Sequence, residues 1–171
     1  MTAEQLALHV KRVLTENTDR LISEIKDLMD KKGLKKVISH KDQDSVRIGR
    51  SQFQTLMRIA KEAGSLDELI LWLSYQEAKN VEIRYNREDR KSWALPCAGN
   101  NSAAQHVIAS LKLITEEMLK KIQSTHSLSN DQERAGKIVL SADEERTVKL
   151  VIAEKYLGYL YWQATVTSKG A

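Results

Sequence analysis

The strongest constraint on the fold of this chain is a short motif that occurs five times. In each copy a serine or threonine stands three residues before a glutamine or glutamate, and an apolar pattern follows. In such a capping box the hydroxyl accepts a hydrogen bond from a free backbone N–H of the first helical turn, and the longer side chain reaches back to the capping residue. Each motif therefore predicts the start of a helix. The five pairs are Thr2 and Gln5, Ser51 and Gln54, Ser65 and Glu68, Ser102 and Gln105, and Ser141 and Glu144.

Apolar residues repeat at spacings of three and four near each of these starts, which places them on one face of a helix. The chain also has only one proline and seven glycines, too few breakers for the frequent turns of a β-protein. We therefore predict an all-α protein, a single-domain bundle of about five main helices with two long basic loops. The helices are expected at about residues 3–31, 52–63, 66–80, 103–124 and 142–165.

A length of 171 residues suits one domain with its own hydrophobic core. The expected organisation is a leading helix at about 1–31, a basic loop at 32–50, a bundle body at 51–165 and a tail at 166–171. The second basic loop is expected inside the body, at about 81–101. A third loop is expected at about 125–140, with room for a short helix around Asn130–Gly136.

The positive charge of the chain is concentrated in two segments, although the net charge is only +4. Residues 31–50 hold seven basic side chains against two acidic ones, and residues 79–91 hold five against three. Clustered lysine and arginine release counterions on meeting a phosphate backbone, which is the usual electrostatic mark of nucleic-acid binding. Tyr85 and Trp93 lie near the second cluster and are candidates to stack on bases. The alternative is that both segments are solvated loops without a ligand.

The stretch from Arg58 to Ser74 reads as a helix, a corner at Gly64 and a second helix, like the helix-turn-helix units of DNA-binding regulators. The second helix of such a unit enters the major groove, with its N-terminal side chains beside phosphates. Here those side chains include Asp67 and Glu68, which stabilise a helix N-terminus but repel a polyanion. We interpret the stretch as an ordinary helical corner, and a stand-alone DNA-binding regulator remains an alternative function.

The residue types show no arrangement typical of catalysis. The four histidines are scattered, without the Glu-x-x-His pairs of di-iron bundles or the His-Glu-x-x-His of zinc proteases. The sequence has no glycine-rich phosphate loop, and Cys97 has no histidine near it in sequence. We expect a protein that is not an enzyme and binds no cofactor or metal. A structural adaptor bundle without nucleic acid is the third function considered.

Three short motifs follow one another along the chain, between about residues 40 and 165. After a leading helix and a basic linker, Ser51 and Gln52 open a helix in RIGRSQFQTLMRIA. A Tyr-Gln-x-Ala-basic run follows in LSYQEAKN, and the chain closes with the aromatic-rich EKYLGYLYWQATV. In this order of features, over about residues 40–165, the chain resembles the small helical subunits of type III CRISPR effector complexes.

The resemblance implies a non-catalytic RNA-binding subunit, several copies of which line the channel for guide and target RNA. Implied partners are guide and target RNA, other subunits of the complex and copies of the chain itself. We expect contacts with the phosphate backbone, a cytoplasmic location because the lone cysteine suits a reducing compartment, and no membrane contact because no apolar run reaches membrane-spanning length. The residues expected to bind RNA are Lys35, Lys36, Arg47, Arg50, Arg58, Lys79, Arg84, Arg87 and Arg90.

Overall fold

The computed structural model describes residues 1–40, 44–125 and 136–170, and it is mainly helical, as predicted. The purely all-α prediction is incomplete, because two short antiparallel pairs of strands also form. The α-helices are α1 (Ala3–Glu16), α2 (Thr18–Asp30), α3 (Arg50–Glu62), α4 (Leu66–Lys79), α5 (Ala103–Gln123) and α6 (Ala142–Ser168). The strands are β1 (Val81–Arg84), β2 (Arg87–Arg90), β3 (Ser124–Thr125) and β4 (Gly136–Lys137).

The predicted leading helix is wrong as a single element, because it divides at Asn17 into α1 and α2. The Asn17 side chain donates to the carbonyl oxygen of Val13 at 2.7 Å, and the Thr18 hydroxyl donates to that of Thr15 at 2.9 Å. Such bonds from asparagine and threonine compete with the helical ladder and favour a break. Periodicity alone did not show this break, since apolar residues on both sides keep a helical spacing.

Three of the five predicted capping boxes form completely, at Thr2, Ser102 and Ser141. The Ser65 hydroxyl accepts from the Glu68 N–H at 3.1 Å, but the Glu68 carboxylate accepts from the preceding Gly64 instead of returning to Ser65. The box predicted at Ser51 is wrong. Helix α3 begins two residues earlier than expected, and Gln52 accepts from the Gly49 N–H.

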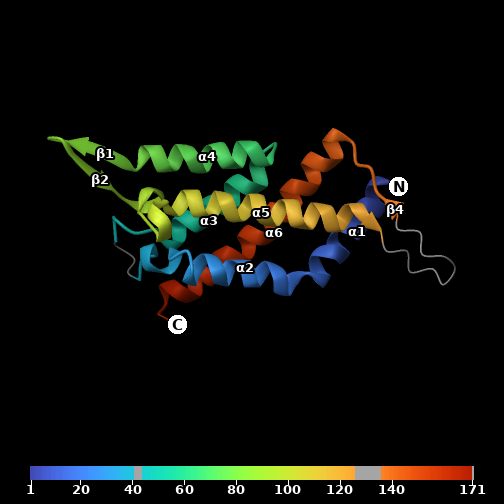
Figure 1. Cartoon of the computed structure of the whole chain (residues 1–171), viewed down its shortest axis with the longest axis horizontal. Coiled ribbons are helices and arrows are strands. Elements are labelled where there is room, and N and C mark those ends of the chain that lie inside the picture. The colour runs from blue at the N-terminus through green and yellow to red at the C-terminus, as the bar shows by residue number, and fades with distance from the viewer. Residues whose placement is uncertain (41–43, 126–135, 171) are drawn as a thin grey trace.

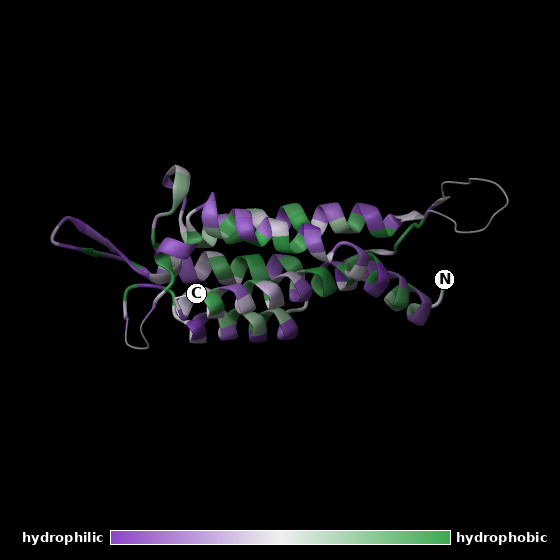
Figure 2. Ribbon diagram, turned by 90° about the horizontal axis from the view of Figure 1, so that it is seen from below, coloured by the Kyte–Doolittle hydropathy of each residue, from purple (hydrophilic) through white to green (hydrophobic). Residues whose placement is uncertain are grey.

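Helix α5 lies at the centre of the bundle, and α1, α2, α4 and α6 all pack against it (Figure 1). Helix α6 also packs along α3. Figure 2 shows green hydrophobic faces turned between the helices and purple hydrophilic faces turned outward. The largest fully buried side chains include Trp93, Tyr156 and Phe53, and most of the other core residues are aliphatic.

A chain of polar side chains crosses from α2 through α5 to α6. Arg20 forms two parallel hydrogen bonds of 2.9 Å with Glu117 and pairs with Glu24 at 3.1 Å. The Ser110 hydroxyl donates to Glu24 at 3.0 Å and shares a short hydrogen bond with the buried Tyr156 hydroxyl. Burial raises the pKa of Tyr156 above its ordinary value. This network of side chains therefore gives each of its buried polar groups a hydrogen-bond partner.

The two long loops predicted from the sequence are largely ordered structure anchored in the core. In the first, Leu34, Val37, Ile38 and Ile48 are buried, and Ile38 and Ile48 form an isolated β-bridge. The second contains the β1–β2 hairpin and two short 3₁₀ turns, Ser92–Ala94 and Ala98–Asn100. The short helix predicted around Asn130–Gly136 lies outside the described residues except for Gly136, which belongs to β4.

Candidate nucleic-acid interface

The segment predicted as the second basic loop, 81–101, begins with the β1–β2 hairpin. Val81 pairs with Arg90 at its base, and Arg84 pairs with Arg87 at its tip. The hairpin continues directly from the end of α4 and projects from one end of the bundle as a largely hydrophilic arm (Figures 1 and 2). Among the described strands, β1 and β2 pair only with each other, and the arm extends beyond the helical core.

Ser92 joins the base of the hairpin to the first basic segment. Its N–H donates to the carbonyl oxygen of Val46 at 2.6 Å, and its hydroxyl accepts from the Gln52 amide at 2.6 Å. The Lys91 N–H donates to the carbonyl oxygen of Asn80 at 3.1 Å, which ties the strand end to α4. The structure thus brings the two basic segments, which are far apart in the sequence, to the same end of the bundle. We call this the basic end, made of residues 31–40, 44–50 and 79–91.

The remainder of the second loop is also tied down. The Ala98 N–H donates to the carbonyl oxygen of Lys32 at 3.0 Å, and a ring nitrogen of His106 bonds the carbonyl oxygen of Ala98 at 2.7 Å. His106 thus has a structural role at the start of α5. These contacts attach the first basic segment, through Ala98, to the start of α5.

The burial of Trp93 contradicts its candidate role in stacking on a base. Its side chain is 1% exposed and lies beneath the base of the hairpin. It meets Phe53 edge to face, with ring centroids 5.3 Å apart. An indole this deeply packed serves the core, because a base cannot reach its faces. Tyr85, the other candidate, is fully exposed.

All nine residues expected to bind RNA are exposed. Eight of them belong to the basic end, whereas Arg58 lies further along α3. At 1.5 Å per residue, Arg58 is about 12 Å from Arg50 along the helix axis. Eight residues at about 100° each place the two side chains roughly 80° apart around the helix axis, at a spacing that suits successive contacts with an extended strand.

Most of these nine side chains already have a carboxylate neighbour. Lys36, Arg50 and Lys79 have no ion-pair partner among the described residues. The pairs formed by the other six are Lys35 with Asp30 (2.8 Å), Arg47 with Asp44 (3.6 Å), Arg58 with Glu62 (3.3 Å), Arg84 with Glu82 (2.6 Å), Arg87 with Asp89 (3.8 Å) and Arg90 with Glu88 (2.7 Å).

The basic end nevertheless keeps a strong positive excess. Its described residues include eleven lysine and arginine side chains against four acidic ones. One of the four, Asp44, accepts backbone N–H bonds from Arg47 and Val46, and these bonds lower its pKa. Such a concentration of positive charge on one end of a small protein attracts polyanions and favours backbone contacts over base-specific ones.

The corner between α3 and α4 has the features of an ordinary helix packing unit. Helix α4 buries Leu69 and Leu73, and it packs against α5. Its exposed first turn carries Asp67 and Glu68, so the surface that a helix-turn-helix protein offers to the major groove is acidic here. Leu71, on the next turn, is also exposed. This geometry gives the DNA-reading alternative no positive support.

The other titratable candidates have structural surroundings. A ring nitrogen of His9 bonds the carbonyl oxygen of Ile122 at 2.8 Å and so joins α1 to the end of α5. Burial raises the pKa of the Cys97 thiol, which lowers the fraction present as the nucleophilic thiolate. Within residues 1–40, 44–125 and 136–170, no group of three His, Cys, Asp or Glu side chains is placed to hold a metal ion.

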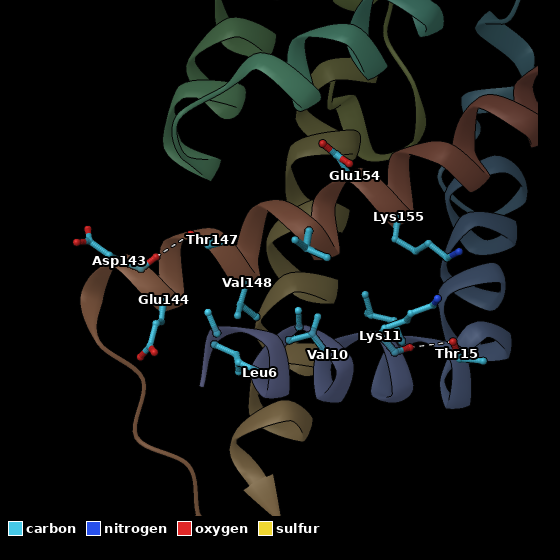
Figure 3. A pocket seen from close by; sticks show the side chains of 14 residues that line it. Leu6, Val10, Lys11, Thr15, Asp143, Glu144, Thr147, Val148, Glu154 and Lys155 are labelled. Carbon is cyan, nitrogen blue, oxygen red and sulfur yellow. Dashed lines mark hydrogen bonds between the residues drawn. The ribbon is translucent and has the colours of Figure 1, made fainter. Parts of the chain in front are cut away.

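A groove of about 670 Å³ lies between α1 and the first half of α6, away from the basic end (Figure 3). Leu6, Val10 and Val148 point into it, and Lys11 and Lys155 extend toward one of its ends. Its lining contains no histidine, cysteine or serine, so it offers apolar contact and lacks a nucleophile of those types.

The aromatic residues of α6 divide between core and surface. Tyr156 is buried, and the Tyr161 hydroxyl accepts from the Gln54 amide of α3 at 3.0 Å. Tyr159 meets Trp162 edge to face, with ring centroids 5.7 Å apart. Trp162 is 65% exposed. An exposed indole of this kind is enriched at protein interfaces.

Comparisons of the chain with protein-family models, curated proteins and solved structures find no match. In the part of the chain that the structure describes, no helix has both the length and the apolar character needed to cross a bilayer. The geometry of the basic end is therefore the main guide to what the protein binds.

Proposed function

We propose that the protein is a non-catalytic RNA-binding subunit of a type III CRISPR effector complex and that it holds guide or target RNA by its phosphate backbone. The observation that supports this proposal most is the convergence of both basic segments on one end of the bundle, where the Ser92 hydrogen bonds join them. The order of sequence motifs supports the type of complex.

The proposed contacts run from the first basic segment onto α3 and the hairpin. Lys36, Arg50 and Lys79 present charge without a neighbouring carboxylate in the described structure, so they are the strongest candidates for phosphate contacts. Arg58 extends the surface along α3. Lysine and arginine contacts of this kind position a strand without reading its sequence.

The proposed protein partners are other subunits of the complex, including copies of this chain. The exposed Trp162 and the adjoining Tyr159 on α6 are the best surface for such a contact, since Tyr and Trp are over-represented where proteins meet. This surface lies on α6, whereas the hairpin follows α4, so the proposal assigns the RNA and protein contacts to different elements.

Removing the three unpaired cations together is expected to weaken RNA binding strongly. For Lys36→Ala, Arg50→Ala and Lys79→Ala combined, we expect about a 100-fold rise in Kd, because each exposed contact contributes about five-fold. The salt slope should fall by roughly 2, since each phosphate contact on a single strand contributes about 0.7. Fluorescence anisotropy with two single-stranded RNAs of unrelated sequence, across a salt series, measures both quantities.

The matched control removes the same charge from the opposite end of the bundle. Arg12→Ala, Lys120→Ala and Arg146→Ala lie on α1, α5 and α6, and this variant is expected to bind both RNAs almost as the unaltered protein does. Equal losses in the two triple variants would show a general charge effect and reject the basic end as the binding site. Stronger binding to duplex DNA than to RNA would favour the regulator, and no binding to either would favour the adaptor.

A further inference from the structure

The turn at the tip of the β1–β2 hairpin has an unfavourable backbone geometry for its residues. Tyr85 and Asn86 occupy the two central positions with φ values of 52° and 61°. Two-residue hairpin turns with both φ values positive favour Asn-Gly or Asp-Gly. A tyrosine in the left-handed region is disfavoured, since its Cβ approaches the following carbonyl oxygen. The turn therefore holds an aromatic residue where a small one is easier to accommodate.

No packing of the Tyr85 side chain offsets the backbone cost of this turn, because the side chain is fully exposed. It has no ring contact with another aromatic residue or a cation in the described structure, in contrast to Tyr159, which has both. An unpacked aromatic residue with positive φ at the end of a projecting arm is a candidate for contact with a ligand.

Two arginines flank the tyrosine. Arg84 and Arg87 are directly opposite each other in the closing pair of the hairpin. Like charges in this position are destabilising. Each arginine pairs with a carboxylate two residues away on its own strand, Glu82 or Asp89, which draws the cations partly back from the tip. An anion at the tip would relieve the repulsion between the two guanidinium groups.

We infer that the hairpin tip is a base-stacking wedge, in which Tyr85 stacks on an unpaired RNA base while Arg84 and Arg87 contact the phosphates on either side. Every base has an aromatic face, so this contact tolerates any sequence. It requires an unpaired base, because in a duplex both faces of each base are already stacked. The inference rests on the proposed RNA-binding function and adds to it a preference for single-stranded RNA.

The test replaces the tip without weakening the hairpin. The double variant Tyr85→Asn, Asn86→Gly installs the turn that such hairpins favour, so its melting temperature is expected to equal or exceed that of the unaltered protein. Its Kd for a single-stranded RNA should rise about ten-fold, within the range of one lost stacking contact. The single variant Tyr85→Trp keeps an aromatic face at the tip and should retain the affinity of the unaltered protein.

The decisive comparison uses a second oligonucleotide with the same sugar–phosphate backbone and abasic sites in place of the central bases. The unaltered protein and the double variant should bind this abasic strand equally. A ten-fold difference on the abasic strand as well, or no difference on the normal strand, would overturn the wedge. Leu8→Ala removes an exposed apolar residue of α1, outside both the basic end and the aromatic surface of α6, and should change neither Kd. Failure of the wider proposal looks different, since the unaltered protein would then show no salt-dependent binding to any RNA.

Discussion

Replacing Trp93 with alanine is expected to lower the free energy of unfolding by about 3–5 kcal/mol, the usual cost of removing a large buried aromatic side chain. For a domain of this size the melting temperature should fall by roughly 6–20 °C. The indole is 1% exposed and packs edge to face on Phe53. Its loss leaves a cavity directly beneath the point where the hairpin, α3 and the first basic segment are joined. Thermal unfolding followed by circular dichroism at 222 nm measures the change.

The chain offers a control of the same residue type. Trp162→Ala removes an indole that is 65% exposed, so its expected effect on unfolding is below about 1 kcal/mol. Similar losses in the two variants would mean that Trp93 is not buried as described. Trp93→Ala should also weaken RNA binding at temperatures where the protein remains folded, because the hairpin loses its support.

Replacing Arg20 with glutamine is expected to cost about 2 kcal/mol at pH 7. Removing one partner of a buried charge network usually costs 3–5 kcal/mol, and the partial exposure of Arg20 reduces that value. The substitution leaves Glu117 and Glu24 without their cation, and Glu24 is only 13% exposed. Urea denaturation at pH 7 measures the difference.

The effect of this substitution should depend on pH in a defined direction. The hydrogen bonds from Arg20 lower the pKa of Glu117 below its ordinary value of 4.5. A lowered carboxyl pKa contributes stability that is present above the ordinary pKa and is lost as the pH falls through the folded-state pKa. The unaltered protein should therefore lose more stability than Arg20→Gln between pH 5 and pH 3 (roughly the window of such a shift), and the two proteins should converge in acid.

An exposed pair provides the comparison for this prediction. Arg12 and Glu16 lie 3.8 Å apart on α1 and are both more than half exposed. Arg12→Gln should change stability by less than about 0.5 kcal/mol at any pH, as exposed helix pairs do. A cost for Arg20→Gln that is just as small, or that stays constant from pH 7 to pH 3, would contradict the role assigned to the network.

Local signals in the sequence predicted helices well and their interruptions poorly. Thr2, Ser102 and Ser141 cap helices because a capping box depends on residues within one turn. The break at Asn17 and the start of α3 at Arg50 depend on competing side-chain bonds of similar strength. The hairpin was missed because its strands are short and highly charged and its turn residues, Tyr85 and Asn86, are not the usual pair.

The exposure of the nine candidate side chains was predictable, but their arrangement as a surface was not. Clustering of lysine and arginine selected eight of the nine, and Arg58 was added from its place on the following helix. Their exposure depends mainly on their charge. Their convergence depends on Ser92, Val46 and Gln52, which meet only after the chain has folded. No local pattern marks a buried serine with a φ of 52° as the residue that joins two distant segments. The burial of Trp93 had no local signal for the same reason.

The ion pairs on the hairpin have a consequence for how salt titrations of this protein are understood. In the proposed RNA complex, a phosphate that binds Arg84 would displace the Glu82 carboxylate, and any cation taken up by that carboxylate would offset part of the counterion release from the RNA. Proposed contacts at Arg84, Arg87 and Arg90 would then contribute less to the salt slope than contacts at Lys36 or Arg50. The salt slope would therefore understate the number of phosphates that the hairpin contacts.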